Sequence, residues 1–350
     1  MKRAAIYYHT NFVRNDGAPL YYTHNLKKIE GLEVVHLKGE GDTSNFGKFD
    51  YHFFVDFGED GLPVQDPMWL PKEDGGIKIY VASDTHLDNG FRYEKAKLMD
   101  YVYFNQKRAV EEYKPLPGQK VFFHPHAGEP DAYPTYNIIK KWDVVFIGHM
   151  QELVNYNGFT RIDALDRLFR EFPNFYYGSR TPLDPTANMF EDAAKKFCQS
   201  KIVFNVSIKD DINMRVFETL STGSFLLTNK IPTLSELFED GKHLVTYSTL
   251  DEMVEKAKYY LEHDEEREAI AKAGHELFMK NHTYMCRVKK VLEDVGYKTE
   301  TPDSKVTGTM PKGKEPKDDF KKSTDPKPDK KDVLSPVDKG KDFVKAGETA

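Results

Sequence analysis

Short apolar runs separated by amphipathic stretches recur through most of this 350-residue chain. In the first part, apolar runs predict strands at Ala4–Tyr8, Val34–Leu37, Tyr51–Asp56, Lys78–Ala82, Tyr101–Asn105 and Val121–His124. Helical patterns lie between them at Leu20–Lys28 and Gln106–Glu112, and Asp16-Gly17-Ala18-Pro19 is expected to form the loop after the first strand. Buried strands alternating with helices are typical of a mostly parallel sheet covered on both faces.

The pattern restarts after Pro134. Strands are predicted at Trp142–Ile147, Phe175–Gly178, Ile202–Val206 and Phe225–Thr228, with helices at Arg161–Phe172, Met189–Gln199 and Arg215–Leu220. From Leu250 the chain is helical, with one break at His263-Asp264, where Asp264 is a candidate cap. At a second break Thr283 is expected to cap the last helix, Tyr284–Val295, which is long enough to reach back over the first domain.

These patterns predict an α/β protein with two domains of similar build, at residues 1–135 and 136–298. Residues 299–350 interleave Lys with Asp and Glu among prolines and few large apolar residues, so we expect a disordered tail. Net charge is −6, which does not indicate nucleic-acid binding.

Cysteine and apolar content narrow the class of protein. The two cysteines, Cys198 and Cys286, are far apart, which predicts reduced thiols and a cytoplasmic protein. No segment has the roughly 20 apolar residues of a transmembrane helix, and the N-terminus lacks the apolar core of a signal peptide. No metal is expected, because His124 and His126 are separated by one proline with no further ligand at a standard spacing.

The densest candidate chemistry lies between Lys209 and Asn229. Asp210 and Glu218 stand eight positions apart, Asn213 and Arg215 lie between them, and the helix must end at Gly223. If a strand ends at Val206, this loop lies at the carboxyl edge of a parallel sheet, where ligands bind in α/β folds. A carboxylate beside the free N–H groups of a helix start suits the hydroxyls and phosphates of a nucleotide, although Glu218 paired with Arg215 on an exposed turn is the plainer alternative.

Further candidates lie near other strand ends. Gly148 follows a strand and can let the backbone approach a phosphate, while Arg161 starts the next helix and is either a second phosphate ligand or an ordinary surface arginine. Asp84, Thr85 and His86 follow the strand IKIYVAS, where His86 is either a ligand contact or a structural histidine. The glycine patterns of nicotinamide-binding and P-loop proteins are absent from the sequence.

The run NMRVFETLSTGSFLLTN, the following LSELFEDGKHLVTYSTLDEMVEKAKYYLEHDEEREAIAKAGHE and the later HTYMCR carry a family resemblance. They are similar to the C-terminal half of glycosyltransferases like the spore-maturation protein CgeB, relatives of the large retaining GT-B family. VASDTHLDNG, KAKLMDYVYFNQ and FHPHAGEP extend the resemblance into the first half. It implies two Rossmann-like domains facing across a cleft, with the acceptor on the first domain and a nucleotide-sugar donor on the second.

The resemblance also implies roles for single residues. Glu218 takes the position that hydrogen-bonds the donor ribose, and Asp210 takes the position where the wider family usually has a glutamate near the transferred sugar. Asp211, the next residue, is the alternative for that position. Arg215 and the backbone around Asn213 fall near the donor phosphates and sugar, with Arg161 as a second candidate for the phosphates, and the loop with Asp84 and His86 faces the donor. We therefore expect a hexosyltransferase-like enzyme without metal or tightly bound cofactor, whose substrate is a nucleotide-diphosphate sugar.

The sequence leaves the acceptor open between polysaccharide, protein, small molecule and modified base. Because Asp210 replaces the usual glutamate, a non-catalytic nucleotide-sugar-binding protein is one alternative function. A nucleotide-sugar epimerase of the same fold is another.

Overall fold

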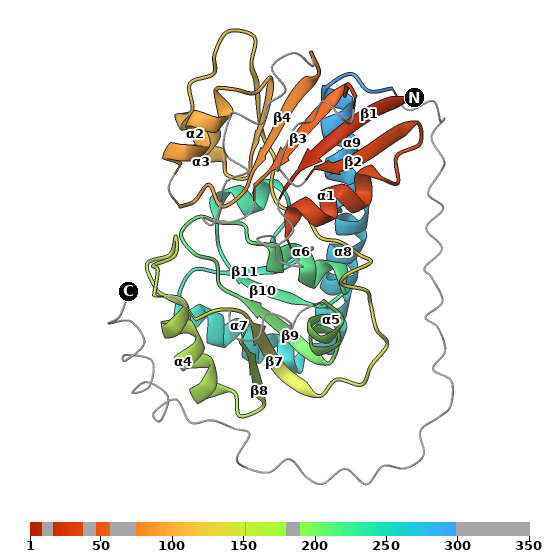
Figure 1. The fold of residues 1–350 in the computed structure, drawn as a ribbon. Helices are drawn as coiled ribbons and strands as arrows, with labels where there is room; N and C mark the ends of the chain where they lie inside the picture. Colours follow the sequence, from red (N-terminus) through yellow and green to blue (C-terminus); the bar gives the residue numbers. More distant parts are fainter. Residues whose placement is uncertain are drawn as a thin grey trace, which may run out of the picture.

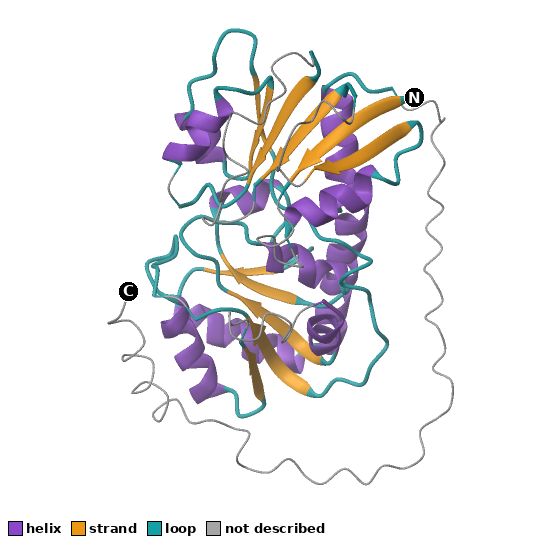
Figure 2. Cartoon of the chain, in the orientation of Figure 1, coloured by secondary structure: helices purple, strands orange, loops and turns teal. Residues whose placement is uncertain are grey.

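The computed structural model describes residues 1–8, 17–37, 47–56, 75–87, 89–150, 152–179 and 190–298. The expected tail, 299–350, lies outside these ranges, as does Asp16 of the predicted loop. Within them the chain forms two parallel sheets, one in each half of the sequence and each packed against helices (Figures 1 and 2).

The first sheet has the strand order β2-β1-β3-β4-β5-β6. Its elements are β1 (Lys2–Tyr7), α1 (Ala18–Leu26), β2 (Leu32–Leu37), β3 (Tyr51–Val55), β4 (Ile77–Ala82), α2 (Gly90–Ala96), β5 (Tyr101–Phe104), α3 (Lys107–Glu112) and β6 (Lys120–Phe123). All six predicted strands are present. The prediction missed α2, and it was wrong to place Ala18 and Pro19 in a loop, because proline fits the first turn of a helix, where its missing N–H has no partner to lose.

The second sheet has the order β11-β10-β9-β7-β8. Its elements are β7 (Trp142–Ile147), α4 (Arg161–Glu171), β8 (Phe175–Gly178), α5 (Phe190–Cys198), β9 (Ser200–Asn205), α6 (Met214–Ser221), β10 (Leu226–Asn229), the 3₁₀ helix η4 (Pro232–Glu236), β11 (Val245–Tyr247), α7 (Leu250–Glu262), α8 (Asp264–Asn281) and α9 (Tyr284–Asp294). The short strand β11 was not predicted. Asp264 is the first residue of α8 rather than its cap, and its carboxylate accepts a hydrogen bond from Arg267 at 2.6 Å.

Side chains on successive strand positions face opposite sides of the first sheet, as a parallel sheet covered on both faces requires. Ala4, Ile6 and Tyr8 join a core cluster with α1 and α9, whereas Ala5 and Tyr7 join a second cluster with α2 and α3. The second sheet is built in the same way, with one core cluster against α4 and α7 and another against α5. This double burial explains why the strands read as almost continuous apolar runs.

The last helix, α9, leaves the second sheet and packs on the first, as predicted (Figure 1). Tyr284, Val288 and Val291 of α9 belong to the same core cluster as α1. Thr283 caps α9, as predicted, by accepting the N–H of Cys286 at 3.2 Å.

The chain crosses between the sheets twice, and the two crossings are joined. Gly128 N donates to His282 O at 3.1 Å, and Tyr284 N donates to Gly128 O at 3.0 Å. The Arg287 guanidinium donates to the carbonyl oxygens of Pro125 at 2.8 Å and His126 at 3.0 Å. A Cβ at Gly128 would lie 2.8 Å from the Phe278 ring, so only glycine fits this close approach.

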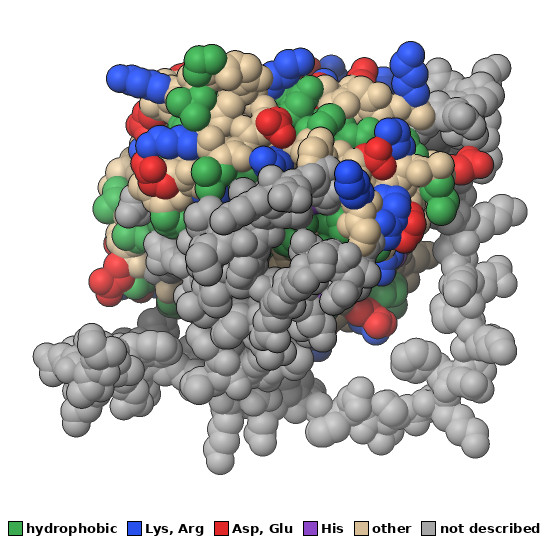
Figure 3. Space-filling view, turned by 45° about the horizontal axis from the view of Figure 1, so that its top comes forward, with side chains coloured by type: hydrophobic (Ala, Val, Ile, Leu, Met, Phe, Trp, Pro, Cys, Tyr) green, Lys and Arg blue, Asp and Glu red, His purple; other side chains and the backbone are tan. Residues whose placement is uncertain are grey.

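The surface carries both signs of charge. On the face seen in Figure 3, Lys and Arg side chains are interspersed with Asp and Glu. Among the described helices, none is both long and apolar enough to cross a membrane.

We expect Arg287→Met to lower the free energy of unfolding by about 2–4 kcal/mol, because it leaves the partly buried carbonyl groups of Pro125 and His126 without their charged donor. Urea unfolding followed by circular dichroism measures this change. Lys289→Met is the matched control, because Lys289 is exposed on the same helix. Equal stability of the two variants would show that Arg287 does not hold the crossings together.

Candidate functional site

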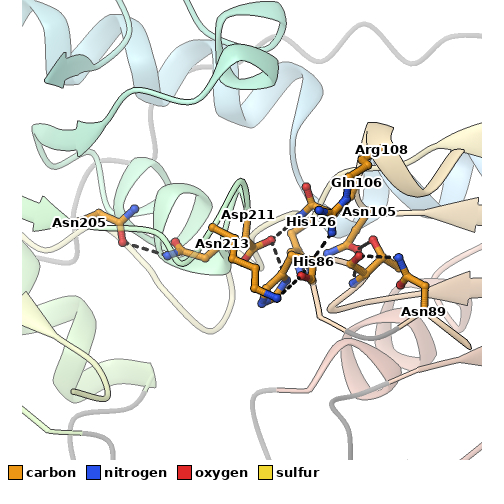
Figure 4. Close-up of polar contacts among 11 residues, drawn as sticks. His86, Asn89, Asn105, Gln106, Arg108, His126, Asn205, Asp211 and Asn213 are labelled. Carbon is orange, nitrogen blue, oxygen red and sulfur yellow. Dashed lines mark hydrogen bonds and ion pairs between the residues drawn. The ribbon is translucent and has the colours of Figure 1, made fainter. Parts of the chain in front are cut away.

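The carboxyl ends of strands from the two sheets meet in one polar network (Figure 4). Gln106, just after β5, donates through Nε2 to Oδ1 of Asp211 at 2.6 Å. Lys209 donates through Nζ to the backbone oxygen of His86 at 3.1 Å. These contacts bring the loop after β4 against the turn that precedes α6, as expected for sheets whose ligand-binding edges face each other.

The loop after β4 is held in an uncommon backbone conformation. Asp84 has a φ of 52°, which non-glycine residues seldom adopt and aspartate tolerates better than most. Thr85 then donates through its backbone N–H and its hydroxyl to Oδ1 of Asn105, at 3.2 and 2.6 Å. Because Asn105 is fixed in this way, its Nδ2 donates to Nε2 of His126 at 2.8 Å, which makes that nitrogen the acceptor.

His86 is buried and faces the other half of the molecule. Its Nδ1 lies 3.6 Å from Oδ1 of Asp211 and has no hydrogen bond within the described part of the chain. A small approach of the two loops would turn this contact into a hydrogen bond. The predicted loop of Asp84 and His86 therefore does face the second sheet, but its carboxylate neighbour is Asp211 rather than Asp210.

Asp211 is buried, and burial raises its pKa above the usual 3.8. His86 and His126 oppose this rise, whereas the nearby carboxylates of Asp84 and Asp210 add to it. Three carboxylates therefore lie close enough to influence one another.

Arg215 and Gly148 lie together at the edge of the second sheet. Arg215 is buried, with its guanidinium carbon 4.7 Å from the centre of the Phe146 ring. A Cβ at Gly148 would stand 2.5 Å from Nη2 of Arg215. The glycine thus makes room for the guanidinium, a different reason from the phosphate approach suggested by the sequence.

Arg161 lies near the same aromatic ring, with its guanidinium carbon 5.6 Å from the centre of the Phe146 ring. It is not an ordinary surface arginine, because its guanidinium donates to Val206 O at 2.9 and 3.2 Å and to His149 O at 2.8 Å. Burial lowers its pKa to about 10, so it remains charged at neutral pH. Two buried cations therefore lie at the end of β7.

Beside these cations are oxygen atoms that only accept hydrogen bonds. Oδ1 of Asp210 and Oδ1 of Asn213 are both inaccessible to solvent, and neither has a donor among the described residues. They lie on the turn into α6, three positions apart. Lys209, which starts this turn, has a φ of 49°, again an uncommon conformation for a residue with a side chain.

Glu218 follows Arg215 by three positions on α6, so the two lie on the same side of the helix. It is 1% exposed, which excludes the alternative of an ion pair on an exposed turn. The helix ends as predicted, with Gly223 at a φ of 68°.

Other histidines serve the framework. His124 is hydrogen-bonded through Nε2 to the Tyr22 hydroxyl at 2.7 Å, so the pair His124 and His126 points to two different partners. Among the described residues, His24, Glu129 and Asp131 come close enough for a metal, but Lys28 already binds Asp131 at 2.8 Å.

Several polar residues of the site were not predicted. Asn105, Gln106 and Asn205 each end or follow an apolar strand, and Lys209 begins the acidic turn. A polar residue at or just after the end of a buried strand was the available signal for Asn105, Gln106 and Asn205.

Comparison with known proteins agrees with this architecture. Residues 165–293 match a family model described as Glycosyl transferase-like. None of the curated proteins searched matches the chain. The residues that match the family model run from α4 to α9 and include the turn and helix that carry Asp210 and Glu218.

Solved structures match over most of the chain at low identity. HepE from Anabaena, in complex with UDP-glucose, aligns with a TM-score of 0.60 at 10% identity, covering 84% of this chain and 99% of that one. Sucrose-phosphate synthase from Thermosynechococcus elongatus gives 0.60 at 8% identity, covering 84% and 98%. A glycosyltransferase from Rickettsia africae gives 0.56 at 10% identity, covering 84% and 97%. The fold is therefore that of GT-B glycosyltransferases, as predicted.

Asp211→Asn should be more stable than the wild type at pH 7. A raised pKa means that the folded state holds the proton more tightly than the unfolded state, so ionisation of Asp211 costs stability as pH rises above 3.8. The advantage of the variant should therefore shrink as pH falls toward 4. Urea midpoints measured between pH 4 and 7 test this.

Asp251→Asn provides the control, since the side chain of Asp251 is 81% exposed. A constant difference between Asp211→Asn and wild type across that pH range would contradict the assignment of Asp211 as the destabilised carboxylate.

Proposed function

We propose that this protein is a glycosyltransferase that moves a sugar from a nucleotide-diphosphate sugar to an acceptor. The observation that carries the proposal is the placement, at one sheet edge, of two buried guanidinium groups beside acceptor oxygens that have no donor among the described residues. In a nucleotide sugar, the diphosphate would bind the guanidinium groups and the sugar hydroxyls would donate to the acceptor oxygens.

The cationic part suits a diphosphate. Arg161 and Arg215 both lie against the Phe146 ring, so their two guanidinium groups form a positively charged site that suits an anion. Asp211 compensates Arg161 in part. The phosphate oxygens of a nucleotide would accept the guanidinium N–H groups not used by Val206 and His149.

The acceptor oxygens suit the sugar and ribose. Hydroxyl groups donate hydrogen bonds, and Asp210 and Asn213 offer oxygens that need donors. His86 would contact the transferred sugar from the opposite sheet, and Glu218 would bind the ribose hydroxyls. Asp84 would support the loop of His86.

The comparisons favour a uridine nucleotide. HepE was solved with UDP-glucose and, in another crystal, with UDP and glucose. We extend this preference to the present chain and propose a hexosyl group as the transferred sugar. Within the glycosyltransferases, we propose that this chain belongs to the CgeB-like group that its sequence resembles.

In the reaction, the bond between the anomeric carbon and the diphosphate oxygen breaks as the acceptor oxygen bonds to that carbon. Arg161 and Arg215 would stabilise the charge that develops on the leaving diphosphate without a metal ion. The diphosphate oxygen would take the acceptor proton, which gives retention of configuration when attack occurs on the same face. The separate thiols of Cys198 and Cys286 suit a cytoplasmic setting. We propose no particular acceptor.

Two other functions differ in what happens to the donor. A binding protein would hold UDP-glucose without consuming it, and the shorter side chain of Asp210 is the feature that favours it. An epimerase would convert the donor sugar without an acceptor. Analysis of UDP-glucose after long incubation with the protein separates these outcomes from slow hydrolysis or transfer.

Arg215→Met should weaken binding of UDP about 10–100-fold, because a charge-assisted hydrogen bond to phosphate is lost. Isothermal titration calorimetry measures the dissociation constant. Arg170→Met, an exposed arginine on α4, is the control and should bind as the wild type does. Undiminished binding by Arg215→Met would remove the diphosphate assignment.

Glu218→Gln tests the ribose contact with little change of volume. Thermal-shift measurements with UDP should show a smaller stabilisation than in the wild type, because the amide replaces one acceptor oxygen by a donor. Glu265→Gln, exposed on α8, is the control. The ribose assignment fails if Glu218→Gln keeps the full UDP-induced shift.

A further inference from the structure

Asn213 occupies a helix N-cap position but does not cap the helix. Asparagine is among the best N-cap residues, because its side-chain oxygen accepts a free N–H of the first turn. Thr160, Thr249 and Thr283 all do this on their helices. Asn213 makes no side-chain cap bond, so its amide is committed elsewhere.

The amide of Asn213 is bound to Asn205, at the end of β9. Asn213 Nδ2 donates to Asn205 Oδ1 at 3.1 Å, as Figure 4 shows. Asn205 is fully buried, and its Nδ2 donates to Thr228 Oγ1 at 3.0 Å. The amide oxygen of Asn205 therefore faces Asn213, and its amide nitrogen faces Thr228.

The orientation of both amides follows from Arg215. Its Nη1 lies 3.4 Å from Asn205 Oδ1, and a guanidinium can only donate. Asn205 must therefore present its oxygen to Arg215, and that same oxygen requires the NH₂ group of Asn213 to face it. The Oδ1 of Asn213 is consequently left as an acceptor that no donor in the described part of the chain satisfies.

We infer that Asn205 is a positioning residue, which fixes Asn213 so that its Oδ1 accepts a hydrogen bond from a hydroxyl of a neutral, hydroxyl-bearing sugar on the donor. This inference rests on the proposed function and specifies the sugar class for the same site. Asp210 Oδ1 offers a second acceptor on the same turn. An acceptor pair of this kind binds hydroxyls and rejects groups that carry only acceptor oxygens.

The surrounding charge points to the same class of sugar. Asp84 and Asp210 act electrostatically on Asp211, so three carboxylates gather where the two loops meet. His86, His126, Lys209, Arg108 and Arg161 are the basic groups near them, and the two arginines near Phe146 are assigned to the diphosphate. Asp210, whose Oδ1 is the second acceptor, would repel a sugar carboxylate but not a neutral hexose.

The test compares binding of UDP, UDP-glucose, UDP-galactose and UDP-glucuronate by calorimetry, so that the ratio of affinities isolates the sugar. For the wild type, a neutral hexose should improve binding over UDP by about tenfold, and glucuronate should not. Asn213→Ala should abolish this improvement, so that affinity for UDP-glucose falls by a larger factor than affinity for UDP.

Asn205→Leu should lose the same improvement through Asn213, so that UDP-glucose again loses more affinity than UDP does. Asn205→Asp is the matched variant that keeps an acceptor facing Asn213 and Arg215, and it should keep most of the improvement. In the double variant Asn205→Leu/Asn213→Ala, the loss should equal that of Asn213→Ala alone, because both changes act on one contact.

The inference is overturned if UDP binds but neither neutral hexose improves affinity, if glucuronate binds better than glucose and galactose, or if Asn205→Leu keeps the wild-type ratio. It is also overturned if Asn205→Leu weakens UDP and UDP-glucose equally, since that is the result of a merely structural role. Failure of wild-type protein to bind UDP at all would instead contradict the proposed function on which the inference rests.

Discussion

The pairing of the two chain crossings, Gly128 with the segment that ends at Thr283, fixes how the two sheets face each other. A parallel sheet presents its loops after the strands at one edge, and each half of this protein has such an edge. With the crossings joined and α9 packed on the first sheet, those edges meet at His86, Gln106 and Asp211. Residues more than a hundred positions apart thereby become one site.

Within that site, the buried guanidinium of Arg215 sets the direction of the polar contacts. Because arginine has no acceptor atom, it orients Asn205, and Asn205 orients Asn213. Gly148 lies beside this group, and a Cβ at that position would stand 2.5 Å from Nη2 of Arg215. Cationic and acceptor groups therefore lie next to each other at one turn and strand end, an arrangement that suits a ligand with an anionic part and a hydroxylated part.

Much of the framework was predictable because burial on both faces of a sheet gives strands a strong apolar pattern, as at Trp142–Ile147. Helix boundaries were predictable where local chemistry sets them, since Thr283 starts α9 and Gly223 follows the end of α6. The helix α2 was missed because its first residue is glycine and its buried face includes Arg92 and Lys95, which a pattern search counts as polar. Asp211 was recognised only as a neighbour of Asp210, because nothing local in the sequence shows which of two adjacent carboxylates turns toward Gln106. Asn205 went unnoticed because its role depends on contacts with two residues of the following helix.

The central claim is that a nucleotide sugar binds where the turn before α6 meets the loop of His86. A crystal structure of the protein with UDP-glucose tests it most directly. We predict the diphosphate beside Arg215 and Arg161, the glucose hydroxyls within hydrogen-bond distance of Asn213 Oδ1 and Asp210, and His86 on the opposite side of the sugar. A nucleotide bound away from Arg215, or a sugar that contacts neither Asn213 nor Asp210, would contradict the account.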